Sequence, residues 1–517
     1  MNRKVRVRFA PSPTGPLHMG GVRTALYNYL FARQNNGDFI LRIEDTDQNR
    51  FVPGAEEYII EALKWSGIIP NEGVGFGDGP YAPYRQSERK GLYKQYADQL
   101  VKSGYAYYAF DEAEALEQLR KDMESRKQTF AYNAQTRINL KNALTLSADE
   151  TEKLLSEGTH YVIRLKVPGD EEVHLTDIIR GEVKVHTSQM DDKVLFKSDG
   201  MPTYHLANVV DDYLMKITHV IRGEEWLPSA PLHVLLYRYL GWENVMPQFA
   251  HLPLLLKPDG NGKLSKRDGD RLGFPVFPLN WTDPETKELS SGYREKGYIP
   301  AAFVNMLSLL GWHPSDDKEL FTMEELIQAF SLERVSKSGA KFDPEKTKWF
   351  NEQYLRQQPD AELAAHLKLA VKTKYHFADN DHRMQDAFLL HSVRLMKERV
   401  HFESEMLEIG SYLFEAPVTY DEQVITKRWK PELADFFVQL TDAYKSASTW
   451  NEVEAEATFK AVAEKVQRKP NELLQLFRVM VSGQGGGLHL FSMVELLGRD
   501  EIVGRINKAL NALQTHA

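Results

Sequence analysis

Val5 to Gly21 reads VRVRFAPSPTGPLHMGG, and this segment sets the architecture of the N-terminal part of the chain. Apolar and basic residues alternate over its first five positions, which predicts a β-strand. Prolines and a glycine between Pro11 and Pro16 then favour an extended loop. From Gly21 to Arg33 the apolar residues fall largely on one side of a helix. The segment therefore predicts a strand, a loop and a helix in this order.

A second strand is predicted directly after this helix. Asn36-Gly37 ends the helix, and Phe39–Ile43 is an apolar run broken by one arginine. A strand, a helix and a strand in succession are typical of a βαβ unit with a parallel sheet. The same order recurs later, where Ile217–Ile221 predicts a strand and residues 229–240 predict a helix. We therefore expect an α/β domain built from two such parts.

The segment between these two parts has a different texture. Residues 111–192 begin with a charged helical run and continue into a strand-like stretch, Tyr161–Val167, which indicates a domain inserted into the α/β fold. Beyond Glu325 the pattern is almost entirely helical. One apolar stripe at helical spacing is predicted to pack inside its own domain: Phe388, Leu389, Val393, Met396 and Val400. The glycine-rich stretch Ser482–Gly487 predicts a loop.

The composition is that of a globular protein with several domains. The chain has 517 residues, 42% hydrophobic and 26% charged, which suggests three or four domains of about 150 residues each. It contains no apolar run long enough to span a membrane, and its N-terminus lacks the apolar core of a signal peptide. Because it also has no cysteine, we expect no disulfide, no cysteine-based zinc or redox site, and a cytoplasmic location. The net charge of −9 neither supports nor excludes a nucleic-acid partner, since phosphate binding depends on local basic patches.

His18-Met19-Gly20-Gly21 opens the first predicted helix. Amide groups at a helix N-terminus favour anions, so a triphosphate can bind there. Glycines at Gly20 and Gly21 would let a base or ribose approach the backbone, and His18 can donate a hydrogen bond to a phosphate oxygen. Taken alone, the four residues are also compatible with a helix-capping histidine. Their position after a strand and a loop favours a nucleotide site.

A second basic motif, Lys263-Leu264-Ser265-Lys266-Arg267, follows a polar, turn-rich approach at Lys257–Gly262. Two lysines three residues apart suit a mobile loop that closes on pyrophosphate. A solvated basic loop is the alternative, and the pentapeptide alone does not exclude it.

Together the two motifs resemble the joint signature of class I aminoacyl-tRNA synthetases. Four further blocks occur in order and resemble bacterial glutamyl-tRNA synthetases closely: Phe9–Gly15, Leu41–Asp47, Pro202–Asp212 and Val220–Trp226. The resemblance implies an α/β Rossmann-type catalytic domain with an inserted α+β acceptor-binding domain, followed by all-α stem-contact and anticodon-binding domains. The expected bounds are 1–110 and 193–255 for the two catalytic halves, 111–192 for the insertion, 256–358 for the stem-contact domain with the lysine loop, and 359–517 for the anticodon domain.

The resemblance also implies a reaction, in which glutamate and ATP form glutamyl-adenylate and the acyl group then passes to tRNA(Glu). It gives catalytic roles to His18, Lys263 and Lys266. It places ATP, with Mg²⁺ as a bridging cation, near Gly20, Gly21, Glu225, Trp226, Leu255 and Lys266. It places a base of the anticodon near Arg399. We expect a monomer that acts without a membrane.

Glutamate carries two carboxylates and one ammonium, so its site should offer arginines and one acid. Arg8 and Arg222, each near the end of a predicted strand, are the expected carboxylate ligands. The resemblance implies that Arg8 binds the side-chain carboxylate, helped by Tyr204 and Asn208. Glu44 is the expected partner of the ammonium, together with Ser12 and the backbone of Ala10.

Two departures from the family pattern matter. The commonest first motif ends in a second histidine, where this chain has Gly21. Some bacterial members hold zinc through cysteines of the inserted domain, so the absence of cysteine predicts no zinc here. Residues 270–297 form a longer segment than expected after the lysine loop, and we predict an ordered surface insertion of unassigned role.

Three other functions remain compatible with parts of the sequence. A nucleotidyltransferase acting on a small metabolite would share the histidine motif, but it would not need the helical half or the lysine loop. A non-catalytic tRNA-binding homologue would not need intact His18, Lys263 and Lys266. A tRNA-modifying glutamyl paralogue would lack the C-terminal domain. The sequence leaves open whether glutamine tRNA is also charged and whether tRNA must bind before activation.

Overall fold

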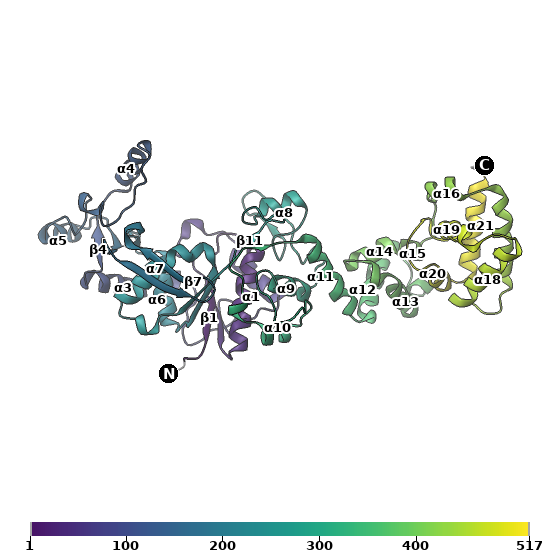
Figure 1. Cartoon of the computed structure of the whole chain (residues 1–517), viewed down its shortest axis with the longest axis horizontal. Helices are drawn as coiled ribbons and strands as arrows, with labels where there is room; N and C mark the ends of the chain where they lie inside the picture. The colour runs from purple at the N-terminus through teal and green to yellow at the C-terminus, as the bar shows by residue number, and fades with distance from the viewer. Residues whose placement is uncertain (1–2, 515–517) are drawn as a thin grey trace. The chain divides into compact units, whose positions relative to one another are not determined.

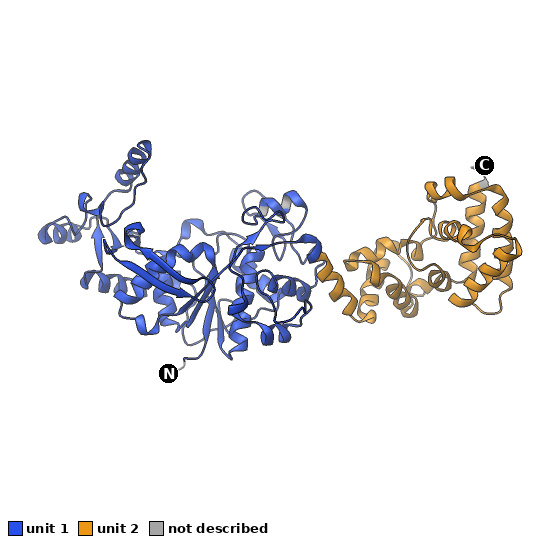
Figure 2. Ribbon diagram, viewed as in Figure 1, with its two compact units in different colours: residues 1–347 blue, residues 348–517 orange. Residues whose placement is uncertain are grey.

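The computed structural model describes residues 3–514, with the side chains of Lys266, Asp270 and Gln514 outside the description. The chain divides into two compact units, residues 1–347 and 348–517 (Figure 2). The first unit is mixed α/β and the second is helical. No helix among the described residues is long and apolar enough to cross a membrane.

The predicted strand, loop, helix and strand begin the first unit. β1 (Arg6–Phe9), α1 (Met19–Gln34) and β2 (Asp38–Leu41) form a βαβ unit, and a short β3 (Glu72–Gly73) extends the sheet in the order β1-β2-β3. The pairing of β1 with β2 is parallel, as the sequence predicts. α1 packs against β1 and β2 and also against the later helices α9 (Pro300–Ser308) and α10 (Met323–Ala329) (Figure 1).

The second α/β part supplies another sheet of the same unit. β9 (His219–Gly223) pairs in parallel with β10 (Gln248–Leu252), and α7 (Ala230–Tyr239) lies between them in sequence. The backbone amide of Thr218 donates to the carbonyl of Arg6, so β1 and β9 lie side by side. The carboxyl ends of β1 and β9 therefore meet at one edge, where ligands bind in such sheets.

The inserted segment contributes strands to two sheets. β4 (Ala106–Ala109), β5 (Val162–Leu165) and β8 (Val194–Phe196) form one antiparallel sheet in the order β4-β5-β8, although β4 and β8 lie outside residues 111–192. β6 (Glu172–Asp177) and β7 (Gly181–His186) lie inside that range, but they belong to the sheet β7-β6-β10-β9. The helices of the segment, α4 (Ala113–Ser125) and α5 (Ala148–Ser156), lie at one end of the unit (Figure 1).

The remaining elements of the first unit follow the same sequence patterns. α2 (Ala55–Trp65) and α3 (Lys90–Lys102) precede the insertion, and α6 (Tyr204–Leu214) follows it. β11 (Leu255–Leu256) pairs with β14 (Ala340–Lys341). In sequence, α8 (Lys266–Leu272) lies between these two strands. β12 (Trp281–Thr282) and β13 (Leu289–Ser290) form a hairpin within residues 270–297.

The second unit confirms the helical reading of the C-terminal half. α11 (Pro344–Gln357) runs into it from the first unit in sequence. Its further helices are α12 (Asp360–Tyr375), α13 (Asp386–Met396), α14 (Met406–Ile409), α15 (Ser411–Phe414), α16 (Glu422–Arg428), α17 (Ala434–Ser446), α18 (Glu452–Lys465), α19 (Pro470–Ser482), α20 (Leu490–Leu497) and α21 (Arg499–Gln514). All five residues of the predicted apolar stripe are buried. In the glycine-rich stretch Ser482 ends α19, and residues 483–487 lie in the loop between α19 and α20.

Candidate active site

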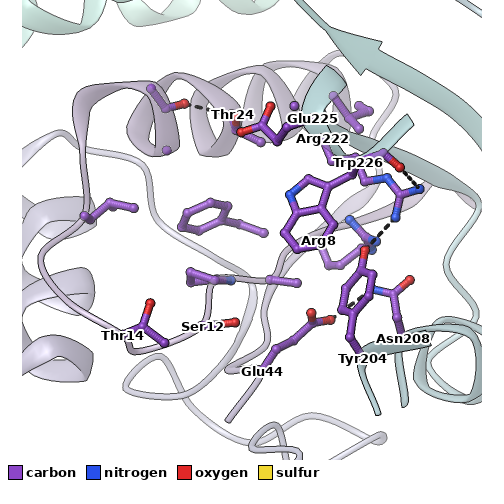
Figure 3. A pocket seen from close by; sticks show the side chains of 18 of the residues that line it. Arg8, Ser12, Thr14, Thr24, Glu44, Tyr204, Asn208, Arg222, Glu225 and Trp226 are labelled. Carbon is purple, nitrogen blue, oxygen red and sulfur yellow. Dashed lines mark hydrogen bonds between the residues drawn. The ribbon is translucent and has the colours of Figure 1, made fainter. Parts of the chain in front are cut away.

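A cavity of about 370 Å³ lies at the carboxyl ends of β1 and β9 (Figure 3). The proline-rich loop, the start of α1 and the start of α6 complete its walls. Most of the sequence-predicted residues line it: Arg8, Ala10, Ser12, Gly20, Gly21, Glu44, Tyr204, Asn208, Arg222, Glu225 and Trp226. The structure thus brings the residues predicted for glutamate and several of those predicted for ATP together in one cavity.

Arg8 reaches the cavity from a buried ion-pair network. Its Nε and Nη2 donate to Oδ1 and Oδ2 of Asp212 at 3.0 and 3.2 Å. Arg42 donates to Asp212 Oδ1 at 2.8 Å and to Glu44 Oε1 at 2.8 Å, so the charges alternate along the network. Burial alone would raise the pKa of Asp212, but Arg8 and Arg42 hold it below its ordinary value. The Arg8 guanidinium is therefore fixed by an ionised carboxylate.

Glu44 is the acidic group at the cavity. Its Oε1 accepts hydrogen bonds from Arg42 and from Asn208 Nδ2, the latter at 3.0 Å. Figure 3 shows Glu44 and Asn208 on either side of the Tyr204 ring. These two bonds occupy one carboxylate oxygen, and Oε2 is suited to a ligand ammonium. Ser12, on the proline-rich loop, is an exposed residue of the same cavity.

Arg222 lies on the wall formed by β9. Its Nη1 donates to Tyr204 Oη at 2.7 Å, and its Nη2 donates to the carbonyl of Trp226 at 3.3 Å (Figure 3). Burial raises the pKa of Tyr204 to about 12, so the phenol stays protonated at neutral pH. Since Tyr204 Oη accepts from Arg222, its own hydrogen can be donated to a second acceptor, such as a ligand carboxylate.

His18 is the N-cap of α1 and carries a defined proton. Its Nδ1 accepts from the backbone amide of Gly20 at 3.1 Å, so the hydrogen of the neutral ring is on Nε2. Nε2 is buried and makes no hydrogen bond with the described residues. Burial, together with the charge of Lys263, lowers the pKa of His18 to about 4. The motif therefore presents a neutral hydrogen-bond donor, and the capping role and the donor role coexist in one side chain.

The two glycines of this motif differ in the space that surrounds them. A Cβ on Gly21 would lie 2.4 Å from Leu17 Cδ1, so a larger residue would force the Leu17 side chain to move. A Cβ on Gly20 would lie no closer than 3.5 Å to any neighbour, and one of its neighbours is the predicted ATP residue Leu255. Both glycines line the first cavity, and the expectation that they make room for a ligand stays a prediction.

The lysine loop is anchored at both ends. Ser265 caps α8 in a capping box with Asp268, and Lys257 Nζ lies 3.3 Å from Asp268 Oδ1. Lys263 Nζ lies 3.1 Å from Glu225 Oε1, which joins two residues predicted to contact ATP or pyrophosphate. Lys266 begins α8, and its side chain lies outside the described part of the structure.

A second cavity, of about 480 Å³, shares the proline-rich loop with the first as part of its lining. His18 lines this cavity, together with Phe277 and Trp281 of the 270–297 segment. The Phe277 ring meets His18 edge-on at 6.0 Å, and the carbonyl of Val276 accepts from the amide of Met19. The segment that sequence reasoning left unassigned therefore packs on the histidine motif.

Several cavity residues were missed by the sequence reasoning. Thr14, Thr24 and Arg50 line the first cavity, and Asp212 and Arg42 hold its arginine and its acid. Asp212 follows Asn208 by one helical turn, so both project from one face of α6. That spacing is the signal that would have identified it.

Two predicted features lie away from the cavity or concern metals. Arg399 is an exposed residue in the second unit, in a short 3₁₀ turn that follows α13. Among the described residues no three histidine, aspartate or glutamate side chains are grouped so as to hold a metal ion. The expectation of no zinc stays a prediction, founded on the absence of cysteine.

Known families match both units. The profile of the family described as tRNA synthetases class I (E and Q), catalytic domain, matches residues 4–349. The profile described as anticodon binding domain matches residues 361–510. The class I catalytic domain and the helical anticodon domain of the predicted architecture are thereby confirmed.

Individual relatives match over the full length. The chain is 56% identical to a glutamate–tRNA ligase of Flavobacterium johnsoniae, covering 99% of this chain and 100% of that one, and 54% identical to one of Porphyromonas gingivalis with the same coverage. A crystal structure of a glutamate tRNA ligase from Elizabethkingia meningosepticum, in complex with its amino acid, matches with a TM-score of 0.94 at 50% identity, covering 99% of this chain and 100% of that one. The chain therefore belongs to the glutamate–tRNA ligases, a family of class I tRNA synthetases.

Proposed function

We propose that the chain activates glutamate with ATP in the first cavity and transfers the glutamyl group to tRNA(Glu) in protein synthesis. In the first step a carboxylate oxygen of glutamate bonds to the α-phosphorus of ATP, the bond to the bridging oxygen breaks, and pyrophosphate leaves. In the second step a hydroxyl of the terminal adenosine of tRNA takes the acyl group and AMP leaves. These steps need positioning and charge stabilisation, and they need no covalent enzyme intermediate.

We assign the amino-acid site to the buried polar groups of the cavity. Arg8 binds the side-chain carboxylate, Arg222 on the neighbouring strand β9 binds a carboxylate together with Tyr204 Oη, and Glu44 Oε2 binds the ammonium. The assignment is supported by the charges: two arginines and one acid match two carboxylates and one ammonium. Asn208, Ser12 and the backbone of Ala10 complete the site.

We assign the nucleotide to the adjoining groups. ATP lies along Gly20, Gly21, Trp226 and Leu255, and the Nε2 hydrogen of His18 is donated to its phosphates. Lys263 leaves Glu225 to reach the pyrophosphate, and Lys266 acts beside it. Mg²⁺ enters with ATP and is held mainly by phosphate oxygens and water, because this ion uses few protein ligands at nucleotide sites.

The proposal also extends to the tRNA. Residues 111–192 bind the acceptor end, residues 256–358 contact the stem, and residues 359–517 read the anticodon, where Arg399 contacts a base. The protein is proposed to act as a monomer.

The observation that carries the proposal is the buried pair Arg8–Asp212 at a cavity that also contains Glu44 and Arg222. A held guanidinium favours a carboxylate over the neutral amide of glutamine. The test is ATP–pyrophosphate exchange with glutamate, glutamine or aspartate, with and without tRNA, followed by charging of purified tRNA(Glu) and tRNA(Gln). Glutamate should support exchange far better than glutamine in at least one of the two tRNA conditions. Equal exchange with glutamine, or no exchange with any of the three, would contradict the proposal.

A further inference from the structure

Three buried side chains form a continuous hydrogen-bonded chain behind the amino-acid cavity. Asp177 Oδ2 lies 2.6 Å from His251 Nδ1, and Arg222 Nε donates to His251 Nε2 at 3.0 Å. The residues lie on the adjacent strands β6, β10 and β9. Asp177 and His251 are fully or almost fully buried, and neither lines the cavity. Of the three, only Arg222 lines the cavity.

The direction of each hydrogen bond follows from Arg222. A guanidinium nitrogen only donates, so His251 Nε2 must accept and the ring hydrogen must lie on Nδ1. His251 then donates to Asp177, whose Oδ1 also accepts from the backbone amides of Ile179 and Arg180 at 3.0 and 2.8 Å. Burial and the charge of Arg222 lower the pKa of His251, although its bond to Asp177 acts in the opposite direction. The ring is therefore neutral, with one defined tautomer.

The hydrogen bond to His251, together with those to Tyr204 and Trp226, fixes the plane of the Arg222 guanidinium. Nε is held by His251, Nη1 by Tyr204 Oη and Nη2 by the carbonyl of Trp226. Each Nη carries two hydrogens, so one hydrogen on each remains for a carboxylate. A planar fork held at all three nitrogens offers these two hydrogens in a fixed geometry, which reduces the ordering that binding would otherwise require.

We propose that Asp177 and His251 are positioning residues for the amino-acid substrate, which act by holding the Arg222 guanidinium in its carboxylate-binding orientation. The inference rests on the proposed function, because it requires Arg222 to bind glutamate. It gives the 111–192 segment a part in amino-acid binding, since Asp177 lies in that segment.

Two substitutions at one position separate this role from a structural one. The amide of asparagine reaches about as far as Nδ1 of histidine, and that of glutamine about as far as Nε2. His251→Asn keeps the donor to Asp177 and removes the acceptor of Arg222. His251→Gln keeps an acceptor for Arg222 and leaves Asp177 Oδ2 without its side-chain donor. The first variant should therefore lose glutamate affinity, and the second should lose stability.

The measurement is KM for glutamate and for ATP in steady-state charging of tRNA(Glu), together with the melting temperature of each variant. His251→Asn should raise the glutamate KM about tenfold or more while changing the ATP KM little, since a hydrogen bond to a charged group is lost. His251→Gln should have the lower melting temperature and the smaller effect on glutamate KM. The matched control is His219→Asn, on the same strand as Arg222 but outside the cavity lining, which should leave both KM values unchanged.

Asp177→Asn tests the other end of the chain. The backbone amides of Ile179 and Arg180 donate to Oδ1 at 3.0 and 2.8 Å, whereas Oδ2 accepts one longer backbone bond, from the amide of His251 at 3.2 Å. We therefore expect the new amide nitrogen to take the Oδ2 position and to donate to His251 Nδ1. The ring hydrogen then moves to Nε2 and opposes Arg222 Nε. This variant should also raise the glutamate KM more than the ATP KM, and it provides the test if His251→Asn does not fold.

Arg222→Ala distinguishes failure of this inference from failure of the proposed function. If Arg222→Ala raises the glutamate KM but His251→Asn and Asp177→Asn do not, the positioning role is wrong and the assignment of Arg222 stands. If Arg222→Ala leaves the glutamate KM unchanged, both are wrong. If His251→Gln had both the lower melting temperature and the larger increase in glutamate KM, Asp177 and His251 would have a structural role only, and the positioning role would be wrong.

Discussion

Arg8 donates two hydrogen bonds to Asp212, and the two side chains are 3% and 1% exposed. The arginine is therefore held in place before any ligand arrives, with its remaining edge directed at the cavity. A buried ion pair costs desolvation energy, and removal of one partner leaves an unpaired charge. We therefore expect the same arginine to contribute both to the fold and to the binding of an anionic ligand.

Replacement of Arg8 should weaken glutamate binding far more than ATP binding. A charge-assisted hydrogen bond is worth about 1.5–3 kcal/mol, so Arg8→Ala should raise the glutamate KM by roughly 10- to 100-fold. The variant should also melt at a lower temperature, because Asp212 keeps only Arg42 as an ion-pair partner. The measurement is KM for both substrates in parallel with thermal melting. An unchanged glutamate KM in a folded variant would remove Arg8 from the site.

His18 offers a way to separate capping from catalysis. His18→Asn retains a strong N-cap acceptor but loses the Nε2 donor, so its rate of adenylate formation should fall on the order of 100- to 1,000-fold with little change in melting temperature. His18→Ala loses both functions and should in addition be less stable by about 1 kcal/mol. Single-turnover rates and melting curves of the two variants provide the comparison. Near-normal activation by His18→Asn would leave the histidine with its capping role alone.

Acid should destabilise the first unit before its carboxylates are protonated. Burial is the main reason that the pKa of His18 and the pKa of His205 are each lowered to about 4. The unfolded chain binds protons at these groups from about pH 6.5 downward and the folded chain does not, so stability falls as pH decreases from 6.5 towards 4. The melting temperature measured between pH 8 and pH 4.5 should show this decline. His205→Asn should make the slope shallower below pH 6.5, and an unchanged slope would contradict the assigned titration.

Lys266 should matter mainly while pyrophosphate leaves. Charge grows on pyrophosphate in the transition state, and contacts made only there lower the barrier without tightening ground-state binding. Lys266→Ala should slow adenylate formation on the order of 100- to 1,000-fold, with little change in glutamate KM. Transfer from preformed adenylate to tRNA should be affected much less. The two steps are measured separately by single-turnover kinetics, with Lys296→Ala, an exposed lysine, as control. Normal adenylate formation in the mutant would contradict the catalytic role and favour the alternative, a solvated basic loop.

Arg399 should affect the choice of tRNA and leave the chemistry unchanged. It is exposed in the unit that matches an anticodon-binding domain. Arg399→Ala should change the ratio of charging efficiencies for tRNA(Glu) and tRNA(Gln) while the KM for ATP stays constant. Transcripts of both tRNAs are sufficient for the assay. An unchanged ratio would count against this residue, though not against the domain.

Secondary structure could be predicted from the sequence where the local apolar pattern matches the element that the fold requires. Alternation over Val5–Phe9 predicts a strand, and the structure has β1 there. The alternation did not reveal that both faces are buried, because Arg6 pairs with Asp38 and Glu72, and Arg8 pairs with Asp212. Partners this far away in sequence cannot be found from periodicity alone.

The residues that line the cavity could be predicted from sequence motifs. The buried residues that hold them in place could not. Arg8, Glu44 and Arg222 each lie near the end of a predicted strand, which is enough to place them at one edge. The buried Asp177–His251 pair belongs to no motif in the sequence reasoning. Its members meet only because β6 pairs with β10, and that pairing is set by tertiary structure. The expected bounds of the insertion, 111–192, stay a prediction, because strand pairing between segments far apart in sequence cannot be found from local patterns.

The arrangement of β6 between β7 and β10 limits how this protein can be recombined with its relatives. A chimera cut at residues 111 and 192 would carry away β6 and β7, and with them two strands of the sheet next to the amino-acid cavity. A cut after β4 and a junction before β5 would leave both that sheet and the sheet β4-β5-β8 whole. The portable part of the molecule is therefore the stretch that contains α4 and α5.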